Sequence, residues 1–439
     1  MRSNNAISSG VVAVIVLVVL IILAFLVLRA SNGPTPTLSP TLTNTVTPPT
    51  PPIDTATQTP VILNTATTVS SQIQIESLSE ITGEVTFWYV SPNDSDTENA
   101  LVRLVEEIRR HNPAAIIELV QISSDDWLRQ YIEAIEANSG PDLLLAPNAY
   151  IDTLALYDFL LPLEEIRDYL KDVVPAAIAV VTIDGRLYAV PYSLATVALY
   201  SNDETVPNPP RTTEELLTLV KDGRTIAIFQ DGYFLFGLGY AYGGTPFNDN
   251  GLCVADERGW SEALVFLKEL HSIESARFLL DYGEARQAFG DGHVDMIIDG
   301  PWALSEYRDA LKDNLDVSPL PRALNPASPI VELNSLFINK NSANLNSAMA
   351  LALSLTSSTA TQEYFEAAQY IPADQKITIN DPLMQSFAVA VMDGFPYPPT
   401  AALDKFLLAF DDAIDQVLLA DENPLDAMRM ACQTANSEQ

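Results

Sequence analysis

The sequence predicts an α/β protein with two globular lobes, preceded by a transmembrane helix and a linker rich in Thr and Pro. Three observations support this prediction: an uncharged apolar run near the N-terminus, a Thr/Pro/Ser segment after it, and two series of alternating strands and helices in the remainder. A chain of 439 residues with 48% apolar content is long enough for two hydrophobic cores.

The apolar run covers residues 11–28 and follows a short N-terminal segment, residues 1–10. Eighteen residues without a charge or a proline are enough to cross a bilayer as a helix. A cleavable signal peptide is the alternative because Arg2 precedes the run, but the run is long and lacks a small-x-small cleavage site. No Cys follows it directly, so a lipid-modified cysteine is not expected. We predict a single-pass anchor in the cell membrane with the large acidic part outside.

Residues 29–81 are rich in Thr, Pro and Ser, and residues 33–71 consist almost entirely of these and apolar residues, a composition that cannot bury enough surface to fold and favours an extended linker. The formal net charge of −34 argues against binding to nucleic acid or to anionic lipid. Two cysteines, Cys253 and Cys432, are too few for a disulfide scaffold; outside the cell they could pair or stay free.

The first series of elements starts at about Thr82 and alternates strands with helices, which is typical of a mostly parallel sheet covered by helices on both faces. Ser123 and Asp126 have the spacing of a capping box, and Trp127, Tyr131 and Ile135 share a helix face. We predict strands at 84–90, 114–122 and 141–147, and helices at 97–111 and 123–140.

A second series predicts another α/β unit, and a further strand and helix follow it. The run Asp249-Asn250-Gly251 suits a hairpin turn. We predict helices at 213–223, 231–244, 257–272 and 342–355, a helix end at 285–292, and strands at 224–229, 294–299 and 329–340.

Signatures of catalysis and of cofactor binding are absent from the sequence. His111, His271 and His293 have no metal-ligand spacing, and no nucleophile elbow, P-loop or dinucleotide fingerprint is present. Nothing singles out a pair of carboxylates for glycoside hydrolysis among 57 acids. We therefore expect a protein that is not an enzyme and has no cofactor or metal.

Aromatic residues at loop-like positions are the remaining candidates for function. Five of them follow a strand end or lie in a Pro/Gly turn, where open α/β sheets bind ligands. Each one alone is more simply a packing residue, but together they favour a ligand surface. They are Tyr150, Tyr192, Tyr233, Trp302 and Tyr397.

Several blocks of the sequence resemble the maltodextrin-type extracellular solute-binding proteins of ABC importers, from about Glu84 to the C-terminus. The blocks are "GPDLLLAPNAY", "GRLYAVPYS", "PNPPRTTEEL", "FQDGYF" and "AFGDGHVDMIIDGPW". The resemblance implies a periplasmic-binding-protein-like type II clamshell, with a ligand cleft between two lobes joined by crossovers. It predicts lobe 1 from residues 82–192 and 330–372, and lobe 2 from residues 198–321 and 380–439.

The resemblance also implies site residues. Trp302 and Tyr233 would stack on sugar rings, Asn148 would bind sugar hydroxyls, and Asp231 lies in the block of Tyr233. The sequence departs from the family where Leu194 to Thr196 replace an expected acid, and where Asp404 and Lys405 stand near an expected aromatic pair. A saccharide that is shorter than maltodextrin or different from it is therefore expected.

The predicted function is capture of a carbohydrate, a disaccharide or an oligosaccharide, by a monomer that delivers it to the permease subunits of an ABC importer. A sensor or adhesion protein that uses the same clamshell without transport is the alternative. An extracellular hydrolase is the third reading, and the absence of a catalytic motif argues against it.

Overall fold

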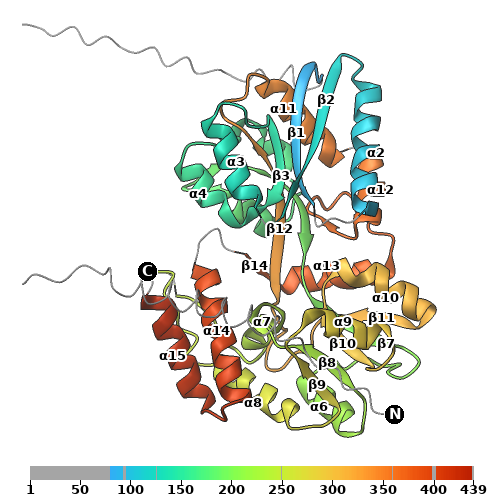
Figure 1. The fold of residues 1–439 in the computed structure, drawn as a ribbon, viewed down its shortest axis with the longest axis vertical. Helices are drawn as coiled ribbons and strands as arrows, with labels where there is room; N and C mark the ends of the chain where they lie inside the picture. The colour runs from blue at the N-terminus through green and yellow to red at the C-terminus, as the bar shows by residue number, and fades with distance from the viewer. Residues whose placement is uncertain are drawn as a thin grey trace, which may run out of the picture. The chain divides into compact units, whose positions relative to one another are not determined.

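The chain folds into two lobes, each around its own β-sheet (Figure 1). The computed structural model describes residues 80–91, 95–124, 126–248, 250–357, 359–397 and 402–437. The predicted membrane span and the linker up to residue 79 lie outside these ranges. Within them, no helix has both the length and the apolar composition needed to cross a bilayer.

The larger lobe contains a seven-stranded sheet in the order β13, β6, β12, β3, β1, β2, with β14 paired to β12. Strand β1 runs parallel to both β2 and β3, which confirms the predicted parallel unit. Strand β12 comes from much later in the chain and lies antiparallel between β3 and β6. The strands are β1 (Gly83–Ser91), β2 (Ala115–Ser123), β3 (Leu143–Pro147), β6 (Val190–Ala195), β12 (Ile330–Ile338), β13 (Ile371–Pro372) and β14 (Phe395–Pro396).

Helices cover this sheet, so β3 is buried along almost its whole length and has the continuous apolar sequence of a central strand. Figure 1 shows α2 and α12 side by side along one edge of the lobe. The helices are α2 (Ser95–His111), α3 (Trp127–Glu136), α4 (Ile151–Leu156), α5 (Pro175–Val180), α11 (Leu345–Ser357) and α12 (Thr359–Ala368). Shorter elements are η2 (Asn148–Tyr150), η3 (Glu164–Leu170), β4 (Thr182–Ile183) and β5 (Arg186–Leu187).

The start of α3 differs from the prediction. Trp127, Tyr131 and Ile135 are buried on one face as expected, but the helix begins at Trp127 and Ser123 ends β2. Asp126 precedes the helix and makes no side-chain capping bond. Its carboxylate binds Arg129, because a charged partner one turn away competes with the backbone N–H groups.

The smaller lobe contains a five-stranded sheet in the order β11, β7, β10, β8, β9. Strand β10 is parallel to β8 and antiparallel to β7, so the sheet is mixed. The strands are β7 (Ala198–Asn202), β8 (Ile226–Phe229), β9 (Ala276–Leu279), β10 (Met296–Asp299) and β11 (Leu315–Ser318).

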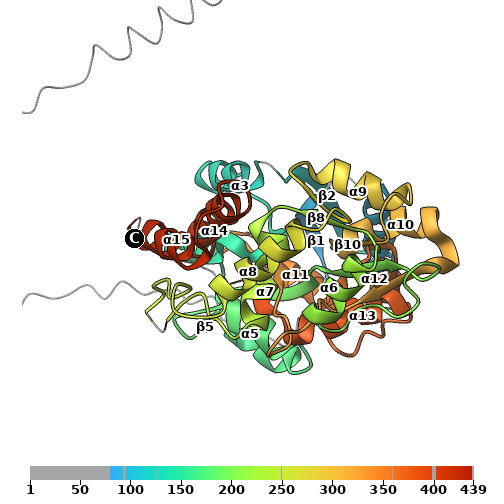
Figure 2. The ribbon, with the colours of Figure 1, turned by 90° about the horizontal axis from the view of Figure 1, so that it is seen from below.

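The helices of the smaller lobe begin where local signals place them. Thr212 and Glu215 form a capping box at the start of α6, and Asp231 caps α7. Figure 2 shows α14 and α15 together at one edge, near α7 and α8. The elements are α6 (Thr213–Lys221), α7 (Gly232–Ala241), α8 (Trp260–His271), α9 (Tyr282–Gly290), η4 (Pro301–Ala303), α10 (Leu304–Leu311), η5 (Lys312–Asn314), α13 (Pro382–Asp393), α14 (Ala402–Leu418) and α15 (Pro424–Ser437).

The chain passes three times between the two sheets and their helices: between β6 and β7, between β11 and β12, and between β14 and α14. Helix α13, which precedes β14, contacts strands of both sheets. The first passage is short, because only Thr196 and Val197 separate β6 from β7. The Thr196 hydroxyl donates to the carbonyl oxygen of Ile330 at 2.7 Å, which joins the first passage to the start of β12. The residue boundaries predicted for the two lobes stay a prediction.

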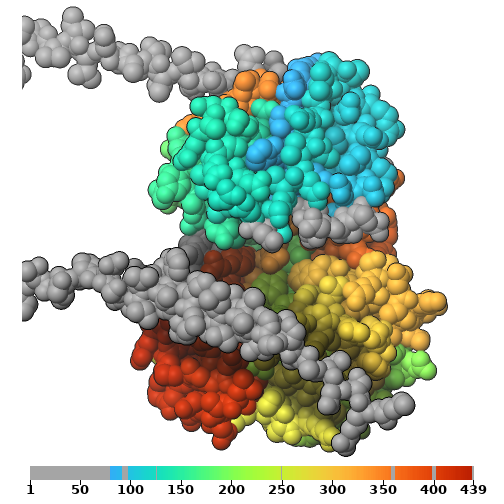
Figure 3. All heavy atoms as spheres, viewed as in Figure 1, coloured from blue at the N-terminus to red at the C-terminus, as the bar shows by residue number. Residues whose placement is uncertain are grey.

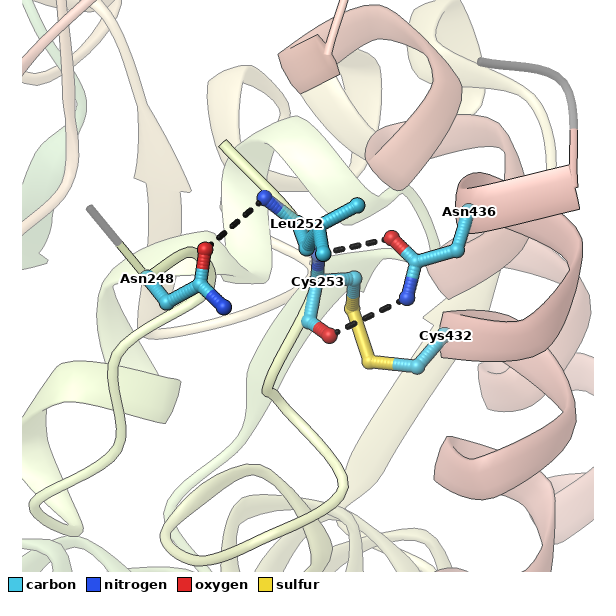
Figure 4. Close-up of a disulfide and its surroundings, with 5 residues drawn as sticks. All are labelled: Asn248, Leu252, Cys253, Cys432 and Asn436. Atoms are coloured by element: carbon cyan, nitrogen blue, oxygen red, sulfur yellow. Dashed lines mark hydrogen bonds between the residues drawn. A yellow bond between two sulfur atoms is a disulfide. The ribbon is translucent and has the colours of Figure 1, made fainter. Parts of the chain in front are cut away.

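A disulfide joins Cys253 to Cys432, 179 residues later, which settles the open question about these cysteines (Figure 4). The Cys253 N–H donates to the Asn436 side-chain oxygen at 2.8 Å, and the Asn436 amide donates back to the Cys253 carbonyl at 3.2 Å. The turn before Cys253 has Gly251 at a φ of +75°, as the predicted hairpin requires, although Asp249 lies outside the described residues. The bridge therefore fixes this turn to α15.

Candidate functional site

A cavity of about 150 Å³ opens in the larger lobe at the carboxyl ends of β1 and β3. Open α/β sheets bind ligands at this end of their parallel strands. The surface is hollowed between the two lobes in the space-filling view (Figure 3). Apolar and polar side chains both line the cavity, among them Tyr89, Leu145, Pro147, Ser193, Glu332 and Asn334.

The smaller lobe contributes a cluster of aromatic side chains. The Phe234 ring centroid lies 5.1 Å from Phe229, 5.3 Å from Tyr282, 5.5 Å from Tyr233 and 6.5 Å from Trp302. We call these five residues the aromatic cluster. Phe229 is the last residue of β8. The other four lie in the first turn of α7, at the start of α9 and in η4, which follow strands β8, β9 and β10 of the smaller sheet. Aromatic rings of this kind present flat apolar faces wherever they reach the surface.

Trp302 follows the turn at the end of β10, as the sequence predicts, with Pro301 as the first residue of η4. Its indole lies over Gly300, where any added Cβ would overlap the ring. Trp302 is half-buried and packs against two hydrophobic clusters, one of which contains residues of both lobes. Its Nε1 donates to the Tyr282 hydroxyl at 2.6 Å. One part of the indole is thus anchored, while another part remains accessible to solvent.

Tyr233 is placed by the N-terminus of α7. The Asp231 carboxylate accepts from the Tyr233 backbone N–H at 2.9 Å, so the predicted site residue Asp231 has a capping role. Burial raises the pKa of Tyr233 well above its usual value of 10.0, and the nearby Glu332 carboxyl adds to this rise. The Tyr233 hydroxyl has no hydrogen-bond partner of ordinary geometry among the described residues. A buried hydroxyl of this kind can still bind a ligand.

Glu332 on β12 is the main residue that the sequence prediction missed. Glu332 is exposed to solvent. Tyr233 of the smaller lobe and Asn334 of the larger lobe lie close to it. Although Glu332 is exposed by its surface area, the protein atoms around its carboxyl raise the pKa of this group by desolvation, against a lowering by Tyr233. The available signal was an acid within the apolar run "PIVELNSLFI", since a carboxylate rarely occurs in a central strand without a reason.

Tyr397 lies near the same carboxylate, and Tyr150 lies near Tyr397. Burial raises the pKa of Tyr397, and so do a hydrogen bond to Asp404 and the charges of the Asp404 and Glu332 carboxylates. The Tyr397 backbone N–H donates to the Val331 carbonyl at 3.0 Å, which places the residue beside β12. Tyr150 is 41% exposed, and the edge of its ring meets Trp127 at a centroid distance of 6.0 Å. Two of the predicted aromatics, Tyr233 and Tyr397, thus come together at Glu332, and Tyr150 lies near Tyr397.

Asn148 and Tyr192 are not presented to the cleft in this structure. Asn148 is 3% exposed; its amide donates to the Val180 carbonyl at 3.2 Å and its oxygen accepts from Ser335 at 3.1 Å. Tyr192 is 2% exposed and packs on Phe365 at a centroid distance of 5.1 Å. Both side chains lie inside the larger lobe. Their predicted contact with a ligand stays a prediction.

Asn334 and Ser193 provide neutral polar groups beside the cavity. The Asn334 amide donates to the Ser193 hydroxyl at 3.2 Å, and Ser193 is 1% exposed. Tyr89 lies deeper, and burial followed by the charge of Glu98 raises its pKa to about 12. Within the described ranges, no group of three or more His, Cys, Asp or Glu side chains is arranged to hold a metal ion. The cavity can therefore offer hydrogen bonds, one recessed carboxylate and aromatic faces.

Known proteins share this architecture. The family model described as bacterial extracellular solute-binding protein matches residues 105–386. The maltotriose-binding protein of Pyrococcus abyssi is 27% identical over 260 residues, which are 54% of this chain and 54% of that protein. The maltodextrin-binding protein MdxE of Bacillus subtilis is 26% identical over 53% of this chain and 62% of its own length. The matches thus span about half to three-fifths of these relatives.

A solved structure extends the likeness to the whole fold. The Thermus thermophilus maltotriose-binding protein, bound with maltotriose, has a TM-score of 0.68 and 25% identity, and the match covers 81% of this chain and 99% of that one. The two-lobed fold with its three chain passages is consistent with the family match over residues 105–386. This chain belongs to the family of bacterial extracellular solute-binding proteins.

Proposed function

We propose that this protein captures an oligosaccharide or disaccharide between its lobes and delivers it to an ABC importer. The observation that carries the proposal is the aromatic cluster of the smaller lobe together with the polar groups around Glu332. Three relatives whose names specify maltotriose or maltodextrin binding support a carbohydrate ligand. We propose no catalytic step, because binding and release are sufficient for delivery.

The chemistry of the cleft suits a sugar. An aromatic ring and the C–H face of a sugar exclude water from each other, and polar side chains satisfy the hydroxyls that burial would leave unpaired. Trp302 and Tyr233 would provide the apolar surfaces. Glu332 and Asn334 would accept and donate hydrogen bonds from the opposite side. A carboxylate forms strong bonds to hydroxyl donors, so Glu332 would contribute to the choice of ligand.

Closure of the lobes would follow from the position of these residues. A ligand that touches both Trp302 and Asn334 stabilises only those conformations in which the lobes approach each other. The three chain passages provide the hinge, and the closed form would be the state that the permease recognises. We propose that the protein acts as a monomer, and that residues 11–28 anchor it while residues 29–81 hold the lobes outside the membrane.

The test is saccharide binding by the purified protein, measured by calorimetry against maltotriose, maltose and longer maltodextrins. We expect saturable binding that Trp302→Ala and Tyr233→Ala each weaken at least about tenfold, since each truncation removes a stacking face. Tyr169→Ala is the matched control, because Tyr169 is 52% exposed and is not part of the aromatic cluster. No binding of any saccharide, or equal affinities for all three variants and the natural protein, would contradict the proposal.

A further inference from the structure

A chain of hydrogen bonds runs from Trp302 into the interior of the smaller lobe. The indole N–H donates to the Tyr282 hydroxyl at 2.6 Å, and that hydroxyl donates to Asp299 Oδ1 at 2.6 Å. The Tyr307 hydroxyl donates to the other carboxylate oxygen of Asp299, also at 2.6 Å. Tyr282 is thus the only residue of this chain of bonds that touches both Trp302 and the carboxylate.

Asp299 is fixed in position. It is fully buried at the end of β10, which lies between β7 and β8 in the sheet. The Gly300 N–H donates to Asp299 Oδ1 at 2.7 Å, and the Tyr200 hydroxyl donates to the Gly300 carbonyl at 2.8 Å. A buried carboxylate with three donors is costly to displace, because each bond it loses leaves a desolvated charge.

Contacts with Arg286, Phe229 and Phe234 hold the Tyr282 ring in place as well. Arg286 lies over the ring, with its guanidinium carbon 5.4 Å from the centroid, and Arg286 pairs with Glu306 at 2.5 Å. Phe229 and Phe234 both lie 5.3 Å from Tyr282, measured between ring centroids. Tyr282 therefore has its ring packed and its hydroxyl bonded at once, so it has little freedom to change rotamer.

We propose that Tyr282 is a positioning residue that fixes the plane of the Trp302 indole, with Asp299 as its buried anchor. The inference rests on the proposed function in one respect, namely that the indole is a surface on which a ligand ring stacks. A tryptophan that can rotate must be ordered when the ligand binds, and this ordering costs affinity. An indole that Tyr282 holds in place avoids that cost. The contacts of Tyr282 with Trp302 and Asp299 assign it this role, which acts through Trp302.

Two tyrosine variants separate this role from a structural one. Tyr282→Phe removes the hydroxyl between Trp302 and Asp299, whereas Tyr307→Phe removes the hydroxyl from the opposite oxygen of the same carboxylate. The full-length chain contains four tryptophans, so labelling with ¹⁵N-tryptophan gives four indole N–H signals. Trp302→Phe identifies the signal of Trp302 by its disappearance. Calorimetry with maltotriose then measures affinity for each folded variant.

We expect Tyr282→Phe to move the Trp302 indole signal upfield and to weaken maltotriose binding about threefold to tenfold, the range for one lost hydrogen bond. Tyr307→Phe should leave that signal and the affinity nearly unchanged. An unmoved Trp302 signal in Tyr282→Phe would overturn the inference, and so would a moved signal with unchanged affinity. If the natural protein bound no saccharide, the proposed function would fail, and the indole signal of the unliganded variants would still decide whether Tyr282 holds Trp302.

Discussion

Two tryptophans of the smaller lobe have similar local sequences and different surroundings. Trp260 follows Gly259, and Trp302 follows Gly300 and Pro301. Trp260 is fully buried and meets Phe406 at 4.8 Å and Phe410 at 5.1 Å between ring centroids. Trp302 is half-buried at the surface of the aromatic cluster. One tryptophan is a core residue, and the other combines packing with an accessible face.

The indole nitrogens show the same difference. Among the residues that the structure describes, buried Trp260 Nε1 has no hydrogen-bond partner, whereas Trp302 Nε1 is bonded to Tyr282. Around Trp260, residues Gly239 and Gly244 leave room for the ring, because an added Cβ at either position would come within about 2.5 Å of it. The apolar packing around Trp260 offsets one unsatisfied N–H. At Trp302 the indole N–H is bonded to the Tyr282 hydroxyl of the same lobe, and this bond at the ring edge does not cover the face of the ring.

The largest expected effect is that of Trp260→Ala. Loss of a fully buried indole should lower the free energy of unfolding by about 3–5 kcal/mol, because it removes apolar burial and leaves a cavity. Thermal denaturation of the unliganded protein measures this, and Trp302→Ala should lower the melting temperature clearly less. Equal destabilisation by the two variants would show that Trp302 is a core residue too.

Removal of the disulfide is a second test of how much the core around Trp260 contributes to stability. Cys253 and Cys432 belong to the same hydrophobic core as Trp260. The double variant Cys253→Ser, Cys432→Ser should lose about 2–4 kcal/mol of stability, because the unfolded chain is no longer cross-linked. Thermal denaturation with and without a reducing agent is the measurement. The reducing agent should destabilise the natural protein and leave the variant unaffected, and saccharide affinity of the folded variant should be retained.

Asp411 links the surroundings of Trp260 to those of Tyr233. It follows Phe410 in α14, and Phe410 packs on Trp260. The Asp411 carboxylate accepts from the Gly232 N–H at 2.5 Å, at the start of the helix that bears Tyr233. Burial raises the pKa of Asp411 to about 6, and the carboxylates of Asp231, Asp415 and Asp412 add to this rise. A raised pKa means that the folded protein binds this proton more tightly than the unfolded chain.

The contribution of protonated Asp411 to stability is therefore fully present below the unfolded pKa of about 3.9 and is lost as the pH rises through about 6. Asp411→Asn keeps an acceptor for Gly232 without the charge. We expect this variant to be about 1 kcal/mol more stable near pH 7, a figure reduced for partial solvent access. Melting temperatures at about pH 4.5 and about pH 7 measure the difference. A less stable variant at the higher pH would show that a negative charge at the α7 N-terminus outweighs the repulsion.

The smallest expected effect concerns Tyr192 in the larger lobe. Its hydroxyl is buried without a hydrogen-bond partner among the described residues. Tyr192→Phe removes this group without leaving a large cavity, so the free energy of unfolding should change by less than about 1 kcal/mol. Calorimetry should show unchanged saccharide affinity. A clear loss of affinity would return Tyr192 to the binding site, as the sequence alone predicts.

Local signals in the sequence were enough for most secondary structure. The predicted strand at β3, the predicted helix at α6 and the position of Trp302 after a strand were each confirmed, since each depends on residues that are neighbours in the chain. The capping box at Ser123 was wrong, because Asp126 has Arg129 as a stronger local partner. The placement of Trp302 at the end of β10 was also predicted from the turn that precedes it.

The sequence by itself determined the α/β class, the two lobes and the candidate aromatics, because strand periodicity, turn residues and composition are local properties. Only the tertiary structure decided which candidates share a surface. It brought Tyr233 and Tyr397 together at Glu332, turned Tyr192 and Asn148 inward, and paired Cys253 with Cys432. The physical reason is that burial and hydrogen bonding at each position depend on side chains that lie tens or hundreds of residues away, as Trp302 depends on Tyr282 and Asp299.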